Sequence, residues 1–165
     1  MGAGYHGGFG DTKGRRERAA PGTVALVKPR PGDNFGKFAL RAQPKEGYTD
    51  VIIHGHPETD KVAVFHNGEW KDLDQRRLAT YVKHDMGYKS GPIRLISCST
   101  GAQNFAQDFA NKMGVKVIAP SDTVWAHPSG KLTIGPKSYI DNGHWNEFKP
   151  RKRGKNNDFK KTRIL

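Results

Sequence analysis

Two side chains in this sequence are capable of acid–base and nucleophilic chemistry, and each ends an apolar run. His54, followed by Gly55, ends the run VIIHG (51–55), and Cys98, the only cysteine, ends RLISC (94–98). If the two runs are neighbouring strands of a parallel sheet, their carboxyl ends meet at one edge, where catalytic groups gather. An imidazole beside a thiol is the pair that a cysteine hydrolase needs, with histidine as base and sulfur as nucleophile.

The residues around this pair add to the hypothesis. Gly55 has no side chain, so its N–H could stabilise a substrate oxyanion together with the N–H of Cys98. Ser99 to Gly101 lead from the cysteine into an expected helix, whose N-terminus would then face the sulfur and favour the thiolate. The ordinary alternative is that Cys98 is a buried small hydrophobe and that His-Gly is a simple turn.

The elements that must position these residues follow from the apolar pattern. Continuous β-branched runs predict buried strands over 48–54, 93–98 and 115–119. We also expect a strand over 24–27, a hairpin strand over 61–65 that turns at Asn67-Gly68, and a hairpin of 123–126 with 131–134. One helix is expected to begin at an Asp72/Gln75 cap and to have Leu73, Leu78, Tyr81 and Val82 on its apolar face. A second helix is expected over 102–113 and to end at Gly114. Strands separated by single helices predict an α/β fold with a parallel core, which the hairpins extend or border.

Charge divides the chain into three parts. The net charge is +12, and all of the excess lies in residues 1–46 and 149–165, while residues 47–148 hold eleven basic and eleven acidic side chains. We therefore expect an irregular basic lead-in with edge strands (1–46), an α/β domain (47–148) and a basic tail (149–165). Basic flanks could hold a polyanion such as nucleic acid or simply be solvated. No stretch approaches the roughly 18 apolar residues of a membrane helix.

The order of motifs resembles the caspase-like (clan CD type) cysteine peptidases, most closely the autoprocessing protease domains of large bacterial toxins. The similarity rests on strand–His-Gly, a hairpin, a helix, LISCST 44 residues after the histidine, the Phe-containing helix NFAQDFANKMG, and Asn142-Gly143 before Trp145. It implies a caspase-like sandwich with a mainly parallel central sheet, flanking helices and β-hairpins. It also implies Cys98 as nucleophile and His54 as general base.

The pattern LISCSTG…FAQ…APSDTVW also looks similar to C-terminal domains of bacterial polymorphic toxins of the Rhs-like or contact-dependent kind. That resemblance implies a payload secreted or delivered as the end of a larger toxin. Such a payload acts on a protein substrate in the cytoplasm of the target cell and is neutralised by a cognate immunity protein.

The Cys–His pair itself requires no cofactor, but the autoprocessing domains are activated by inositol hexakisphosphate, which Lys and Arg bind. The neutral middle of this chain lacks a dense basic cluster. Such a site would have to recruit the flank, for example Arg151, Lys152 and Arg153. Ser121 and Asp122, after the third buried strand, are candidates for a specificity pocket or for a local cap.

Other readings of the same residues remain open. His54 and His56 could be metal ligands, although no Cys/His/Asp set at metal-site spacing completes them, and we expect the two rings on opposite faces of their strand. They could instead be the acid and base of a nuclease toxin (RNase or DNase) that uses the basic flanks. A non-enzymatic module whose tail docks a polyanion is the third reading.

Overall fold

A computed structural model describes residues 22–27, 30–86 and 88–151 of the chain. The expectations for the basic lead-in up to residue 21, and for the tail from residue 152, lie outside these residues. The architecture is mixed α/β and is built on a five-stranded sheet in the order β1-β2-β6-β7-β10. These strands are β1 (Val24–Ala25), β2 (Thr49–Ile52), β6 (Ile93–Ile96), β7 (Val117–Pro120) and β10 (Trp145–Phe148).

The middle of the sheet consists of the three apolar runs, which lie side by side as predicted. β1, β2, β6 and β7 are parallel, and β10 adds to β7 in the antiparallel direction. β6 and β7 are buried at every position, because the sheet is covered on both faces and β-branched residues pack well there. The prediction of a parallel core is confirmed.

The register of β2 against β6 relates the two sequence motifs. Val51 pairs with Leu95 and Ile52 with Ile96, a constant offset of 44 residues. The Ile53 N–H then donates to the Ile96 carbonyl at 3.2 Å, so the register continues past the end of both strands. His54 and Cys98, which have the same offset, therefore lie at the same edge of the sheet.

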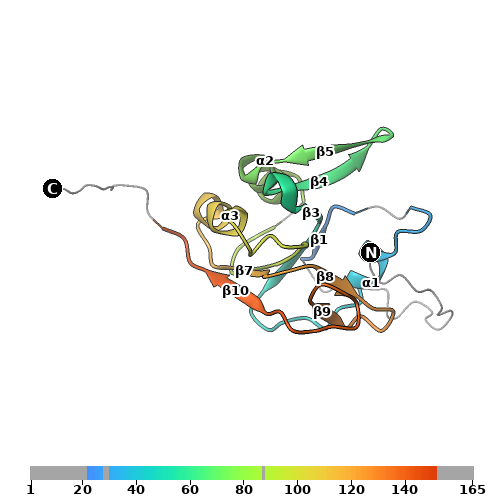
Figure 1. Ribbon diagram of the computed structural model, residues 1–165. Coiled ribbons are helices and arrows are strands. Elements are labelled where there is room, and N and C mark those ends of the chain that lie inside the picture. The colour runs from blue at the N-terminus through green and yellow to red at the C-terminus, as the bar shows by residue number, and fades with distance from the viewer. Residues whose placement is uncertain (1–21, 28–29, 87, 152–165) are drawn as a thin grey trace.

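Two apolar layers cover the sheet (Figure 1). On one face, α2 (Gln75–Thr80), which continues as a π-helical turn (Tyr81–Asp85), packs beside α3 (Phe105–Met113). On the other face lie the short helix α1 (Phe35–Ala39) and the hairpin of β8 (Val124–Ala126) with β9 (Leu132–Ile134). Ile52 and Ile96 belong to this second layer, and Cys98 packs against it.

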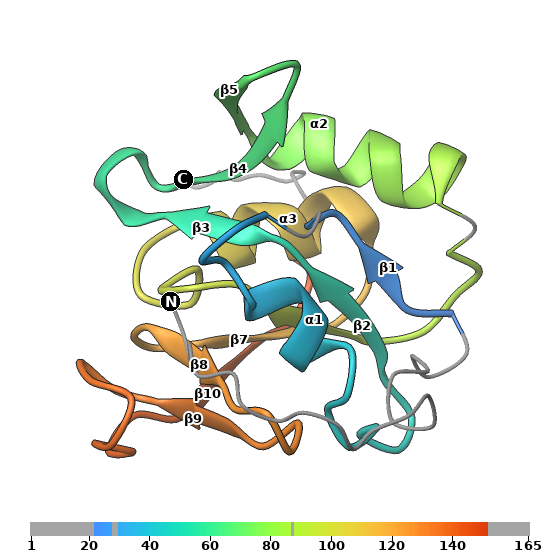
Figure 2. The same ribbon diagram turned by 90° about the vertical axis from the view of Figure 1, so that its right-hand side faces the viewer.

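The hairpins do not extend the central sheet, so that part of the expectation was wrong. Among the described residues, β8 and β9 pair only with each other, and β3 (His54–His56), β4 (Lys61–His66) and β5 (Glu69–Leu73) form a three-stranded sheet of their own. A 3-10 turn (Pro57–Thr59) joins β3 to β4. The run expected as one strand over 48–54 therefore divides at Ile53, between β2, which pairs with β6, and β3, which pairs with β4. Figure 2 shows β3 following β2 and lying beside β4.

Local turn chemistry was mostly predicted correctly. Asn67 and Gly68 both have positive φ (51° and 81°), as the tight β4–β5 turn requires, and Gly114 ends α3 in the left-handed conformation. The cap of α2 was misplaced, because Asp74 rather than Asp72 accepts a hydrogen bond from the Arg77 N–H, while Asp72 lies in β5. Among the described residues, no helix is long and apolar enough to cross a membrane.

Candidate active site

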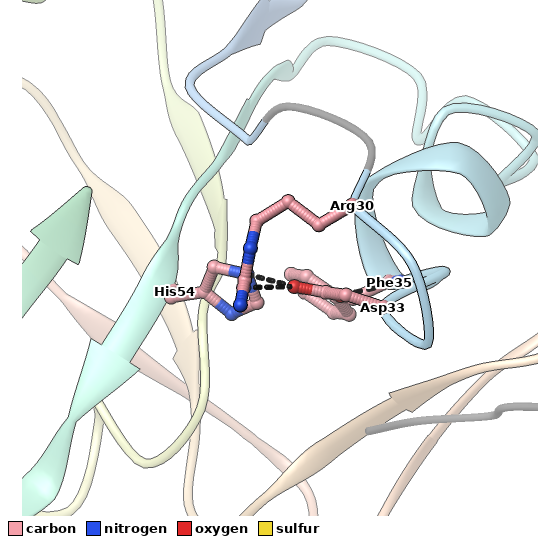
Figure 3. Close-up of polar contacts among 4 residues, drawn as sticks. All are labelled: Arg30, Asp33, Phe35 and His54. Carbon is pink, nitrogen blue, oxygen red and sulfur yellow. Dashed lines mark hydrogen bonds and ion pairs between the residues drawn. The ribbon is translucent and has the colours of Figure 1, made fainter. Parts of the chain in front are cut away.

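His54 is the first residue of β3, and its ring is held by the segment before α1 (Figure 3). Its Nε2 lies 3.1 Å from Oδ2 of Asp33, which also forms an ion pair with Nη1 of Arg30 at 3.3 Å. The ring of Phe35 packs at 5.4 Å from the imidazole, and that of Trp70 meets it edge-on at 5.2 Å. The imidazole is therefore held by a carboxylate and two aromatic rings.

The surroundings of His54 favour its neutral form. Burial lowers its pKa below the ordinary value of 6.5, and the Arg30 charge lowers it further, while the charge and hydrogen bond of Asp33 partly oppose this. A neutral ring whose Nε2–H donates to Asp33 has its lone pair on Nδ1. Nδ1 is therefore the atom of His54 that is able to accept a proton.

Cys98 is half-buried and lies in the layer formed with α1 and the β8–β9 hairpin. Its Sγ lies 3.6 Å from the Val124 carbonyl oxygen, to which the thiol donates. Burial raises the pKa of this thiol above its ordinary value, and the nearby carboxylate of Asp122 acts in the same direction. The Cys98 thiol and the His54 imidazole are thus both expected to be neutral at neutral pH.

The prediction that a helix N-terminus favours the Cys98 thiolate was wrong. α3 begins only at Phe105. The N–H groups of Asn104 and Phe105, at the start of this helix, donate to the Asp60 carboxylate at 3.2 and 3.3 Å. The helix dipole is therefore used to bind Asp60 and does not stabilise a thiolate.

Gly55 lies directly against the cysteine backbone. A Cβ built at Gly55 would overlap the Cys98 carbonyl oxygen and come within 3.0 Å of the Cys98 nitrogen. Within the described part of the chain, the Cys98 N–H has no backbone carbonyl as partner, whereas the next N–H, of Ser99, donates to the Asp122 carbonyl. Ser99 itself has a φ of 57°, which sets the sharp turn after the cysteine.

An open pocket of about 670 Å³ lies beside His54, and His56 also lines this pocket. It is lined by His54, Gly55, His56, Ala63, Trp70 and Asp72. His56 Nδ1 lies 2.9 Å from Oδ1 of Asp72. The expectation that the two histidines point to opposite faces was wrong, because residues two apart on a strand share a face.

The other residues singled out from the sequence lie in local structure. Oγ of Ser121 accepts from the His144 N–H at 3.1 Å, and Oδ1 of Asp122 accepts from the Thr123 N–H at 2.7 Å. These bonds fit the cap alternative, while the specificity-pocket role stays a prediction. Arg151 is exposed and its N–H donates to Asn111, but Lys152 and Arg153 lie outside the described residues.

Sequence reasoning missed two acidic partners of the site. Asp33 follows a Pro-Gly turn 21 residues before His54, and Asp72 was assigned to a helix cap. The turn chemistry around Asp33 was visible, but nothing local linked it to the histidine. The His56–Asp72 pair depends on the register of three strands. His56 lies opposite Lys61 on β4, and Asp72 lies opposite Ala63, two residues further along the same strand.

Comparison with known proteins gives a family. Residues 23–134 match the model of the family described as "Domain of unknown function (DUF8616)", and the chain belongs to this family. The matched segment contains Asp33, His54 and Cys98 and ends before β10. No curated protein and no solved structure matches the chain significantly.

Proposed function

We propose that this member of the DUF8616 family is a cysteine hydrolase that cleaves a peptide bond with Cys98 as nucleophile and His54 as general base. The observation that carries the proposal is the β2–β6 register, whose offset of 44 residues brings the two motifs to one edge of the sheet. Gly55 in contact with the Cys98 backbone supports it, because the residue after the base then adjoins the nucleophile.

The order of elements supports a relationship to the caspase-like peptidases. The chain runs from β2 to His54-Gly55, then through the β4–β5 hairpin and α2 to β6 and Cys98, and on through α3 and β7 to the β8–β9 hairpin. This is the order on which the sequence resemblance rests. We propose a caspase-like arrangement of the central sheet on this basis.

The reaction starts from the neutral pair. The thiol leaves the Val124 carbonyl by rotation about Cα–Cβ, and Nδ1 of His54 takes its proton as Sγ attacks the carbonyl carbon. Asp33 is the positioning residue, because its bond to Nε2 fixes the ring and the tautomer, and its charge stabilises the imidazolium that forms.

The negative charge that develops on the carbonyl oxygen meets the N–H groups of Gly55 and Cys98. When the C–N bond breaks, the amine leaves with the proton from His54, and a thioester to Cys98 remains. Water then attacks this thioester with His54 again accepting a proton, which releases the acid and restores the thiol.

The biological setting that we propose rests on the resemblance to polymorphic toxins. The domain is the payload of a secreted bacterial toxin, acts on a protein in the target-cell cytoplasm and is held inactive by an immunity protein. No cofactor takes part in the steps above. Inositol hexakisphosphate would need cations from the basic flanks.

The test is expression of the domain in bacteria, with growth and newly formed protein N-termini as readouts. Cys98→Ala and His54→Ala are each expected to restore growth and to abolish the new N-termini, while circular dichroism shows an unchanged fold. Tyr139→Ala, at a ring that is 80% exposed, serves as control and should keep full activity. Full activity in folded Cys98→Ala would end the proposal.

A second candidate function is favoured by the pocket. Two histidines on one strand, each bonded to its own aspartate, line the same cavity beside an exposed indole. Such a pair could act as acid and base on a phosphodiester, with Trp70 stacking on a base. This nuclease predicts RNA or DNA degradation that persists in Cys98→Ala and is lost in both His54→Ala and His56→Ala.

A further inference from the structure

We propose that the pocket beside His54 is a substrate subsite for a cationic side chain, with Asp72 and Trp70 as its recognition groups. The inference rests on the proposed peptidase function and specifies its substrate class, namely a protein with arginine or lysine near the cleaved bond. It begins from the face of the three-stranded sheet that carries His54, Ala63 and Asp72, which the segment from Arg30 to Phe35 covers only in part.

The pocket exists because a small residue lies in the middle strand. His54, Ala63 and Asp72 form one row across β3, β4 and β5. The methyl group of Ala63 leaves space between the outer strands, so the side chain of His56 reaches across to Asp72. Ala63 is the buried floor of the cavity, and the polar groups are its walls.

The wall has the chemistry of a cation site. Asp72 is the carboxylate among the lining residues, and within the described residues its Oδ1 binds His56 while its Oδ2 takes part in no hydrogen bond or ion pair. Trp70 is 46% exposed, an unusual position for an indole that contributes to packing. A carboxylate oxygen beside an aromatic ring is suited to a guanidinium or ammonium group.

The chain itself shows that a guanidinium fits these rings. Cζ of Arg30 lies 4.3 Å from the centroid of the Phe65 ring and 5.1 Å from that of Trp70, while Nη1 pairs with Asp33. The aromatic pair on this face thus already holds one cation against a carboxylate. The pocket offers the same combination, an indole with Asp72, to a second cation.

Charges at the rim do not cancel this preference. Glu58, 89% exposed, approaches Nε2 of His56 at 3.9 Å, and Lys61 is the residue opposite His56 on β4. These two opposite charges flank the second histidine. The Arg30 guanidinium over the Trp70 ring is already paired with Asp33, and Asp72 is the carboxylate among the residues that line the pocket.

The experiment uses the Cys98→Ala protein labelled with ¹⁵N, so that binding is measured without turnover. Nα-acetyl-arginine amide is titrated against its citrulline analogue, which has nearly the same shape but no charge, and the Trp70 indole N–H and the Ala63 amide are followed by NMR. We expect the arginine compound to shift both signals and to bind at least about tenfold more tightly than the citrulline compound.

Two variants locate the site, and a third is their control. Asp72→Asn is expected to weaken arginine binding about tenfold, and Ala63→Leu to abolish it by filling the floor. Glu69→Gln removes the same charge from the same strand outside the pocket and should change nothing. If Ala63→Leu fails to fold, the affinity of Asp72→Asn for the arginine compound still tests whether the site is the pocket.

Equal binding of citrulline, an unchanged affinity in Asp72→Asn, or stronger shifts with uridine monophosphate would each overturn the subsite. Failure of the peptidase proposal is a separate result. Arginine binding together with full cellular activity of Cys98→Ala would leave the pocket as a cation site and end the peptidase proposal. Cys98-dependent cleavage without arginine binding would support the peptidase proposal and end the subsite proposal.

Discussion

Gly55 and the backbone of Cys98 are in direct contact, with no room for a side chain between them. Gly55, which follows the candidate base, and Cys98, the candidate nucleophile, therefore define each other's position. Any group larger than hydrogen at Gly55 must push the cysteine or the strand away.

Gly55→Ala is accordingly expected to abolish Cys98-dependent activity and to lower the free energy of unfolding by about 1–3 kcal/mol, the usual cost of overpacking. Urea denaturation and the growth assay measure the two effects. Lys112→Ala, at an exposed position near the end of α3, is the control and should change neither. An active, fully stable Gly55→Ala protein would contradict the close contact.

The buried thiol leads to a prediction about reactivity. Because burial raises the pKa of Cys98, we expect alkylation by iodoacetamide to be slow at pH 7 and to rise about tenfold per pH unit up to pH 9. His54→Ala should slow the reaction near neutral pH, where the imidazole is the available base. A fast rate that is flat between pH 6 and 8 would instead indicate a preformed thiolate–imidazolium pair.

Asp33 and Arg30 should shift the pKa of His54 in opposite directions. Asp33 raises this pKa and Arg30 lowers it, so Asp33→Asn is expected to lower it further and Arg30→Gln to raise it. NMR titration of ¹³C-labelled histidines measures both shifts. Asp72→Asn, which alters the partner of His56, is the matched control, and a His54 shift as large as that in Asp33→Asn would argue against the assigned contact.

The pair of Asp50 and Arg94 gives a prediction about stability. The Arg94 guanidinium binds both oxygens of Asp50 at 2.7 and 2.8 Å, and the side chains are only 10% and 7% exposed. Asp50→Ala leaves a buried charge without its partner, and we expect it to lower the free energy of unfolding by about 3–5 kcal/mol. Breaking the exposed pair of Lys71 and Glu69 should cost less than about 1 kcal/mol in the same urea titration.

The sequence predicted best where one strong local signal decides the structure. The apolar runs predicted the parallel strands, Asn67-Gly68 the hairpin and Gly114 the helix end. It failed where two solutions look alike locally. Asp72 and Asp74 both lie in front of α2, and only tertiary packing determines which of them caps it.

The division of the first strand at Ile53 was not visible for a similar reason. The run Val51 to Ile53 is uniformly apolar, so nothing in it marks the point at which the chain leaves one sheet for another. The helix α1, with five residues, is too short to show a helical period. Asp33 was missed because its contact with His54 links a turn to a strand that lies 21 residues later in the sequence.

That division also has a consequence for dynamics. Cys98 follows a strand in the middle of the large sheet, whereas His54 already belongs to the small one, and Ile53 joins the two. Small sheets at the edge of a fold open more readily than the central strands. Amide hydrogen exchange should therefore be faster in β4 and β5 than in β6 and β7, and a partner that clamps the small sheet would order the base without touching the nucleophile.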